Sequence, residues 1–298
     1  MSSLISYLMV WFPLSIIFNL PLLFINLKKQ YLTVPFGILT GAILGVSLFV
    51  IQPFFWIVLC VFFFSSSILT KLKAKEKQIT TSNFAKGSSK RDALQVIANG
   101  IIPLLFAFSY FFFEVFPNLT SNHTNPHDPF SPLFIGVFVA FAVHTADTWA
   151  TEIGILSKKR PRLVTNLRQS VEPGTSGGIT LNGCFASLFG ASLIATTYLI
   201  SVLIISLEGI NQKLLVFTII VVIGGFLGSI IDSIEGAAIQ GIYYCDHCEK
   251  ETESNPHKRC GNETRLYRGI KIFNNDFVNL SSALILAFSI SLIISLSF

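Results

Sequence analysis

The chain alternates between long apolar runs and shorter polar gaps. About eight apolar runs of ~18–26 residues are present, each long enough to cross a hydrocarbon core of about 30 Å as a helix that rises about 1.5 Å per residue. The runs cover residues 4–26, 31–51, 53–70, 93–116, 131–150, 178–203, 214–236 and 278–298. The pattern therefore predicts an all-α fold, a polytopic membrane bundle of about eight transmembrane helices.

The polar gaps differ in their basic residues, and this difference predicts a topology. Of the 21 Lys and Arg residues, all except Lys213 lie in alternate gaps, which share one side of the membrane once the runs are threaded in order. Loops rich in Lys and Arg stay in the cytoplasm. We therefore expect both termini to lie outside, and the long gaps 71–92, 157–177 and 237–277 to lie in the cytoplasm.

Composition favours a membrane protein and excludes other classes. The 298 residues are 52% hydrophobic and 12% charged, whereas soluble domains are about a quarter charged. The net charge of +5 is the excess that orients a membrane protein. The sequence has neither a basic recognition helix nor an aromatic platform for single strands, so we expect no nucleic-acid partner. We interpret residues 1–298 as one integral-membrane domain, with three variable helices in 1–70.

Four acidic residues lie near the cytoplasmic ends of two apolar runs. Asp147 and Glu152 end the fifth run, and Asp232 and Glu235 end the seventh. An ionisable group within a span costs about 3 kcal/mol or more near the bilayer centre and is a functional candidate by default. Asp232 and Glu235 are three residues apart and therefore share a helix face.

Small residues around these acids favour close packing of the two helices. Acids on both helices would then converge on one hard cation. Carboxylate oxygens suit Mg²⁺, which also takes phosphate oxygens from a substrate. We predict that Asp147 and Asp232 hold Mg²⁺, with Glu152 and Glu235 in support. The alternative is that the acids lie in the headgroup region and pair with basic residues of the loops.

Polar residues also lie at the starts of two predicted helices, on the same cytoplasmic face of the membrane as the four acids. They are Arg91, Gln95 and Asn99 around the start of the fourth run, and Asn275, Asp276 and Asn279 around the start of the eighth. Helix capping would explain one residue in each set. We predict that Asn99, Asn275 and Asn279 orient substrate oxygens, and that Arg91, Gln95 and Asp276 bind substrate or nucleotide.

The loop between the fifth and sixth runs is the strongest anion-binding candidate. Its last residues are Pro173, Gly174, Thr175, Ser176, Gly177 and Gly178, which lead straight into the next predicted helix. Such an entry offers backbone N–H groups, and the helix N-terminus adds positive potential for phosphate. Arg162 and Arg168 would add charge-assisted bonds, and Ser233 is a further candidate beside Asp232. Together with the acids, the loop predicts phosphate transfer; a plain Gly-rich connector is the alternative.

Cysteine and histidine residues cluster in the last predicted cytoplasmic loop, 241–272. Cys245 and Cys248 form a Cys-x₂-Cys pair, and His257 and Cys260 follow. This spacing supplies four N/S ligands for zinc. A disulfide is disfavoured in the cytoplasm, so structural zinc and a reduced thiol cluster are the two alternatives.

Five sequence blocks carry a resemblance to a known family. They are RDALQVIANG at 91–100, ADTWATEIG at 146–154, PGTSGG at 173–178, GSIIDSIEGA at 228–237 and NNDFVN at 274–279. In this order they resemble the DUF92 family of integral membrane proteins, which includes phytyl-phosphate kinase of plants and cyanobacteria and animal transmembrane protein 19. The resemblance covers residues 80–298, whereas 1–70 are similar only as hydrophobic helices.

The resemblance implies an activity, which we take as an expectation. It implies transfer of a phosphoryl group from a nucleoside triphosphate, with CTP favoured, to an isoprenoid (phytyl or polyprenyl) monophosphate in the membrane lipid, with Mg²⁺ as cofactor. The product would be the isoprenoid diphosphate. No chloroplast transit peptide is evident, so we expect a bacterial cell membrane with the active site on its cytoplasmic side.

Two other functions fit the same residues. A CTP-dependent cytidylyltransferase would make a CDP-lipid and release pyrophosphate, whereas the kinase releases a nucleoside diphosphate. A lipid or ion-coupled transporter would also use acids within the membrane. A transporter places them near mid-membrane, however, and the acids here gather at one end beside an anion-binding loop, which favours chemistry over transport.

Overall fold

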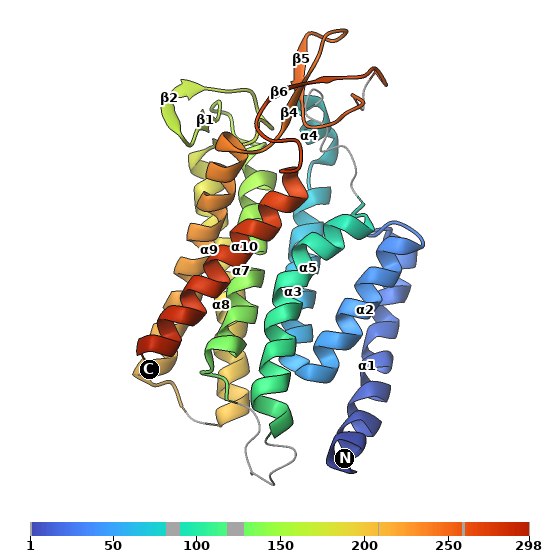
Figure 1. The fold of residues 1–298 in the computed structure, drawn as a ribbon, viewed down its shortest axis with the longest axis vertical. Helices are drawn as coiled ribbons and strands as arrows, with labels where there is room; N and C mark the ends of the chain where they lie inside the picture. Colours follow the sequence, from blue (N-terminus) through green and yellow to red (C-terminus); the bar gives the residue numbers. More distant parts are fainter. Residues whose placement is uncertain (1, 82–89, 118–127, 208, 258–259, 298) are drawn as a thin grey trace.

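The computed structural model describes residues 2–81, 90–117, 128–207, 209–257 and 260–297. Long helices dominate it (Figure 1), so the all-α membrane-bundle prediction is confirmed. The helices are α1 Ser2–Lys29, α2 Phe36–Ile51, α3 Pro53–Lys71, the short α4 Ala74–Thr80, α5 Ala93–Tyr110 with its π-helical extension η1 Phe111–Val115, α7 Pro132–Gly154, α8 Leu181–Ser206, α9 Gln212–Ala238 and α10 Asn275–Ser297.

Seven helices in the described part of the chain are long and apolar enough to cross a membrane, and α2 is a shorter apolar helix of 16 residues. The predicted run 31–51 begins too early, because Leu32 forms a backbone bridge with Arg91 and Pro35 stands just before α2. α2 still runs opposite to α1 and α3 (Figure 1). The alternating order of the predicted spans is therefore kept.

Both termini lie at one end of the bundle, and two small sheets cover the other end, here called the sheet end (Figure 1). The first sheet contains β1 Arg162–Leu163, β2 Asn166–Ser170 and β3 Gly178–Ile179 in the order β2-β1-β3; the second contains β4 Ile242–Cys245, β5 Lys250–Thr252 and β6 Arg265–Arg268 in the order β5-β4-β6. All pairings are antiparallel. The apolar pattern did not predict these strands, because they are short and lie in polar loops.

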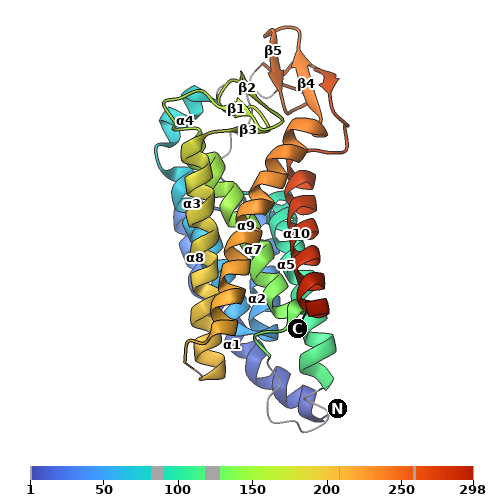
Figure 2. The same ribbon diagram turned by 90° about the vertical axis from the view of Figure 1, so that its left-hand side faces the viewer.

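The two sheets extend different helices. The first sheet lies between the end of α7 and the start of α8, and the second joins α9 to α10 (Figure 2). Leu163 pairs with Gly178 in the first sheet, and Tyr244 pairs with Glu251 in the second. This arrangement brings the Gly-rich loop and the Cys-rich loop to the same end of the bundle.

α7 is the central helix. Its side chains are buried continuously from Phe134 to Ala146, and it contacts α3, α5, α8, α9 and α10. By contrast, α1 lies at the edge, with only 6% of its most apolar window buried. The position of α7 means that its polar end, from Asp147 onward, is surrounded by other helices rather than by lipid alone.

An ion pair ties the short helix α4 to the end of α7. Lys77 Nζ lies 2.7 Å from Glu152 Oε2, and both side chains are largely shielded from solvent. Thr70 Oγ1 donates a 2.8 Å hydrogen bond to the other oxygen, Glu152 Oε1. Glu152 thereby holds α3 and α4 against α7.

Replacement of Glu152 by Gln should lower the free energy of unfolding by about 3 kcal/mol, because the Lys77 ammonium then loses its buried counterion. Unfolding in detergent micelles measures the change. Glu76→Gln is the matched control, since it breaks the exposed Lys73–Glu76 pair, which contributes at most about 1 kcal/mol. Equal losses in the two variants would contradict a structural role for Glu152.

Candidate functional site

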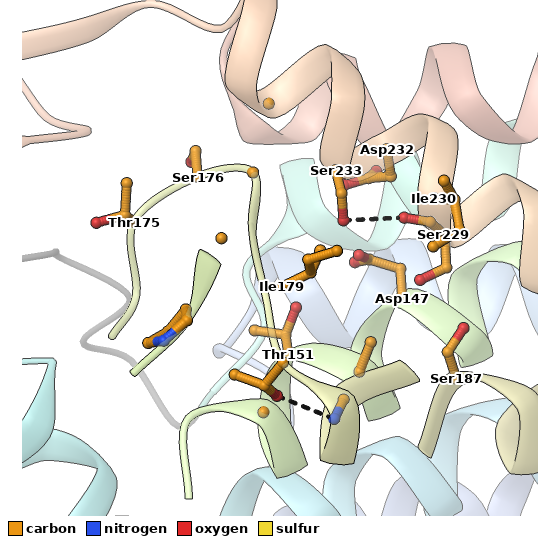
Figure 3. Close-up of a pocket in the computed structure, with 18 of the residues that line it drawn as sticks. Asp147, Thr151, Thr175, Ser176, Ile179, Ser187, Ser229, Ile230, Asp232 and Ser233 are labelled. Carbon is orange, nitrogen blue, oxygen red and sulfur yellow. Dashed lines mark hydrogen bonds between the residues drawn. The ribbon is translucent and has the colours of Figure 1, made fainter. Parts of the chain in front are cut away.

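A polar pocket opens at the sheet end of the bundle. It lies among the ends of α7 and α9, the start of α8, the loop 174–180 and the first residue of α10 (Figure 3). We call it the polar pocket. It contains a large part of the predicted site: Asp147, Gly174, Thr175, Ser176, Gly177, Gly178, Asp232, Ser233 and Asn275.

The register between α7 and α9 sets the position of the two aspartates. The helices run in the same direction, toward the sheet end (Figure 1). Gly228 allows them to approach closely, since a Cβ at this position would lie 2.3 Å from Val143 Cγ2. Asp147 and Asp232 each follow this contact by four residues, about one helical turn. Both therefore reach the same level, and both line the polar pocket.

Each helix contributes one polar face to the pocket. On α7 the lining residues Asp147, Ala150, Thr151 and Gly154 follow the three- and four-residue spacing of one face. Asp232 on α9 also contacts α10, because its Oδ2 accepts a 3.2 Å hydrogen bond from Ser282 Oγ.

Serine hydroxyls occupy the α9 face beside Asp232. Ser229 and Ser233 both line the pocket, and Ser233 Oγ donates a 3.1 Å hydrogen bond to the Ser229 carbonyl, drawn as a dashed line in Figure 3. The α9 face thus presents hydroxyl groups next to a carboxylate.

The Gly-rich loop forms the opposite wall of the pocket, with Thr175 and Ser176 across from the aspartates (Figure 3). Gly177 has a φ of +78°, and a Cβ there would lie 2.4 Å from Ala237 Cβ. Only glycine combines this left-handed backbone with such close packing on the end of α9. The loop is therefore held against α9 through its own backbone.

The loop meets α8 slightly differently from the prediction. Residues 178–179 form β3 instead of leading straight into the helix, and α8 starts at Leu181. Thr180 caps the helix, with its Oγ1 accepting a 3.0 Å hydrogen bond from the Gly183 N–H. The N-terminus of this 26-residue helix still borders the pocket, where its dipole favours an anion.

Two polar groups that the sequence did not single out lie buried in the pocket wall. Ser187 is 1% exposed and Gln240 is 2% exposed. Neither Ser187 Oγ nor Gln240 Nε2 has a hydrogen-bond partner among the described residues. Buried polar groups in proteins are almost always paired with protein atoms or with ordered water, so these two groups are available to bond water or a polar ligand in the pocket.

Ser187 and Gln240 are related by helical spacing to other residues that line the pocket. Gln240 follows Asp232 and Gly236 at four-residue steps, and Ser187 follows Thr180 and Gly183 at helical spacing. The sequence shows this spacing, but the lack of a partner depends on the tertiary structure. A helical-face search started from Asp232 would have found Gln240.

Glu152 and Glu235 do not line the polar pocket, which corrects their predicted supporting role at Mg²⁺. Glu152 follows Asp147 by five residues, about 140° around the helix at about 100° per residue, and it pairs with Lys77 and Thr70. Glu235 Oε2 accepts a 2.5 Å hydrogen bond from Ser281 Oγ. Each glutamate thus connects its own helix to neighbouring helices outside the pocket.

The polar residues at the start of α10 separate into different roles. Asn275 lines the pocket, whereas Asp276 and Asn279 do not. The unpredicted Asn274 caps the helix through a 2.9 Å hydrogen bond from the Phe277 N–H to Asn274 Oδ1. Only Asn275 is therefore placed to contact a ligand of the polar pocket.

Arg91, Gln95 and Asn99 lie in a different, mainly apolar pocket among α1, α2, α3 and α5. This corrects the prediction that they share a site with the aspartates. The Arg91 guanidinium stacks over Phe62, 4.9 Å from the ring centre, and Asn99 Nδ2 donates to the Gln95 carbonyl at 2.7 Å. Arg91 thus packs against α3, the helix that also contacts Glu152 through Thr70.

Arg162 and Arg168 are exposed on the first sheet and do not line the pocket. Arg162 Nη1 donates a 2.6 Å hydrogen bond to the Leu167 carbonyl, which closes the β1–β2 turn. Pro173, the first residue of the Gly-rich block, also lies outside the lining. The positions of Arg162 and Arg168 therefore do not support the predicted charge-assisted bonds to a phosphate in the pocket.

The pocket residues fit a Mg²⁺ ion that is shared with a phosphate. Mg²⁺ is usually held by one or two carboxylates, waters and substrate phosphate oxygens. Asp147 and Asp232 supply two carboxylates from separate helices, and the unpartnered donors of Ser187 and Gln240 suit phosphate oxygens. Such an ion would neutralise charge on the phosphate.

The structure also brings together the predicted cysteine and histidine ligands. One ligand atom from each of Cys245, Cys248, His257 and Cys260 lies within 4.8 Å of all the others. Hydrogen bonds from the Asn262 backbone N–H and from His257 lower the pKa of the Cys260 thiol to about 6. These hydrogen bonds favour the thiolate, which is the form of cysteine that binds a metal.

Comparison with known proteins identifies relatives along most of the chain. The family model described as "Integral membrane protein DUF92" matches residues 17–287, which includes part of α1 and all of α2 and α3. "Protein PGR" of Arabidopsis thaliana is 30% identical over 242 residues, 78% of this chain and 79% of that protein. "Uncharacterized membrane protein MJ0933" of Methanocaldococcus jannaschii is 30% identical over 217 residues, 71% and 77% of the two chains. No solved structure matches the chain.

Replacement of Gly177 by Ala should loosen the Gly-rich loop, because a left-handed backbone costs about 1–2 kcal/mol for a residue with a Cβ and the new Cβ overlaps Ala237. Hydrogen exchange of residues 173–178 should become faster. Gly209→Ala is the control, since nothing lies within 4 Å of its Cβ position. Equal exchange in both variants would contradict the packing of the loop on α9.

Proposed function

The chain belongs to the DUF92 family of integral membrane proteins, and from this premise we propose that it is a Mg²⁺-dependent kinase of an isoprenoid monophosphate. It transfers a phosphoryl group from a nucleoside triphosphate and forms the isoprenoid diphosphate. The observation that carries the proposal is one pocket that combines two carboxylates from parallel helices, a Gly-rich loop, a helix N-terminus and two buried polar groups with no partner among the described residues.

The reaction requires no covalent bond between the protein and the substrate. The acceptor phosphate is already an oxyanion, so the site must hold two phosphate groups in line and neutralise their charge, without removing a proton. Asp147 and Asp232 would hold Mg²⁺, which would supply the positive charge that neutralises the phosphates. Ser187 and Gln240 donate to further oxygens. Thr175 and Ser176, on the loop, position the triphosphate.

The charge balance of the pocket favours metal-assisted binding. The described lining residues include no Lys or Arg, so the positive charge facing the phosphates comes from Mg²⁺, the N-terminus of α8 and backbone N–H groups. Preorganised dipoles of this kind stabilise charge in a site that excludes water. The two aspartates would repel a phosphate in the absence of the ion.

The position of the pocket suits a lipid phosphate. It lies at the ends of membrane-spanning helices, and Ile155, Ile179 and Ile230 line it beside the polar groups. An isoprenoid tail would remain among the helices while its phosphate reaches the aspartates. The basic gaps at this end, read with the positive-inside rule, support a position of the pocket on the cytoplasmic face, where nucleotides are present. The preference for CTP rests on the family resemblance alone.

Asp147→Asn and Asp232→Asn should each lower turnover roughly a hundredfold or more, the effect of removing one preorganised charge-stabilising group. The assay uses purified protein with Mg²⁺, CTP, ATP or UTP, and phytyl, geranylgeranyl or farnesyl monophosphate. Asp128→Asn is the control, because this residue lies at the opposite end and its side chain accepts from the Phe130 N–H. Wild-type turnover in both pocket variants would rule out the assignment.

The products distinguish the kinase from other functions of the same pocket. The kinase releases a nucleoside diphosphate and the isoprenoid diphosphate. Release of pyrophosphate with a CDP-lipid would instead identify a cytidylyltransferase. Lipid or ion flux across proteoliposomes without nucleotide would identify a transporter.

Gln240→Leu should separate binding from folding. Removal of a buried Nε2 group that has no partner among the described residues should leave the unfolding midpoint of the ligand-free protein unchanged or higher. The same change should raise KM for the nucleotide about tenfold, the effect of losing one hydrogen bond to a charged group. Thermal unfolding and steady-state kinetics measure the two effects. A large loss of stability with an unchanged KM would contradict the assignment of Gln240 as a ligand-binding residue.

A further inference from the structure

The second sheet carries four metal-ligating side chains that the proposed kinase chemistry does not use. Cys245 ends β4, and Cys248 lies in the turn that leads to β5. His257 and Cys260 lie in the connection between β5 and β6. Segments far apart in the loop thus bring three thiols and one imidazole to a single point.

The distances among these groups match a tetrahedral zinc site. With zinc about 2.3 Å from sulfur and about 2.05 Å from nitrogen, tetrahedral geometry places pairs of ligand atoms about 3.6–3.8 Å apart. Cys245 Sγ lies 3.6 Å from Cys260 Sγ, and His257 Nδ1 lies 3.2 Å from Cys260 Sγ. All four ligand atoms lie within 4.8 Å of one another. The four ligand atoms therefore converge on one point of the loop.

The donor set selects zinc over other occupants. Three thiols and one imidazole are the N/S ligands of closed structural zinc sites, whereas Mg²⁺ and Ca²⁺ take oxygen ligands. A disulfide would use two thiols and leave the third beside His257 without a role. The basic loops at this end also favour its position in the reducing cytoplasm, where disulfides are rare.

The second sheet is also too small to be stable without a cross-link such as a metal ion. Residues 241–274 are fewer than the about 40 below which a folded unit usually depends on a metal or disulfides. The strands of this sheet bury few apolar side chains fully. Ile242 and Cys245 of β4 are two of them. Cys245 and His257 are themselves buried, so the ligand cluster lies where a hydrophobic core would otherwise be.

Contacts connect this sheet to the wall of the polar pocket. Glu253, just after β5, accepts a hydrogen bond from Ser176 of the Gly-rich loop. Arg268 on β6 donates a 2.6 Å hydrogen bond to the Ala237 carbonyl, beside Gly177. β4 continues from α9 through Gln240, which lines the pocket. The position of the sheet therefore affects the loop.

We propose that Cys245, Cys248, His257 and Cys260 bind one structural zinc ion, and that this ion fixes the second sheet so that Glu253 holds the Gly-rich loop over the polar pocket. The metal site has no open position for a substrate. Its role is to keep the loop in place. The proposal does not depend on the reaction in the pocket, because metal binding and loop order are measured without activity.

Metal analysis of the purified full-length protein tests the site. After expression with zinc and purification under reducing conditions, the wild type should contain one zinc per chain. Cys248→Ser and Cys260→Ser should lose most of it, whereas Cys60→Ser on α3, outside the cluster, should keep it. Substitution with Co²⁺ should give the visible absorption of tetrahedral cobalt thiolate. Less than a tenth of an equivalent in the wild type, or a disulfide among these cysteines, would overturn the zinc assignment.

Hydrogen exchange tests the connection to the pocket. Removal of zinc by a chelator should speed exchange in the second sheet and in residues 173–178, while the helices keep their protection. Glu253→Gln should retain zinc and a protected sheet, yet speed exchange in 173–178 alone. Unchanged exchange of 173–178 after both treatments would overturn the connection and leave only a metal site.

Discussion

The close packing of α9 on α7 is the constraint on which the rest of this structure depends. The two helices are parallel, and they touch where Gly228 leaves room for Val143. One turn beyond that contact, each helix carries an aspartate, Asp147 on α7 and Asp232 on α9. Two carboxylates inside a membrane protein are costly unless a cation, a polar ligand or a proton compensates them. The packing brings both to one pocket, so it defines the position of the candidate site.

The remaining elements of the sheet end serve this pair. The Gly-rich loop passes close to the end of α9 because Gly177 has no side chain, and it then turns into α8, whose N-terminus faces the pocket. The second sheet contacts the loop through Glu253 and the end of α9 through Arg268. Lys77 and Glu152 fix α4 on the other side of α7. The chain therefore carries two sets of charges: one set connects neighbouring elements, and the other, the two aspartates, lines the pocket.

Much of this arrangement follows from residue pattern alone, and the failures have physical reasons. Apolar runs and basic gaps predicted the helices and the common side of the termini. The small residues around the acids predicted that Asp147 and Asp232 lie close together. The five-residue step to Glu152 already argued against a shared site, because it turns the side chain to another face. The position of Arg91 depends on how α3 and α5 pack against α7, which periodicity does not describe. The missing partners of Gln240 and Ser187 depend likewise on the folded neighbours.

The central claim is that Asp147 and Asp232 share one divalent ion with a bound phosphate. Electron paramagnetic resonance with Mn²⁺ in place of Mg²⁺ tests it directly, with the protein in detergent and a nucleoside triphosphate added. The account predicts one bound Mn²⁺ per chain with hyperfine coupling to phosphorus, and loss of this signal in each single Asp→Asn variant. A wild-type Mn²⁺ signal in both variants, or no protein-bound Mn²⁺ in the wild type, would contradict it.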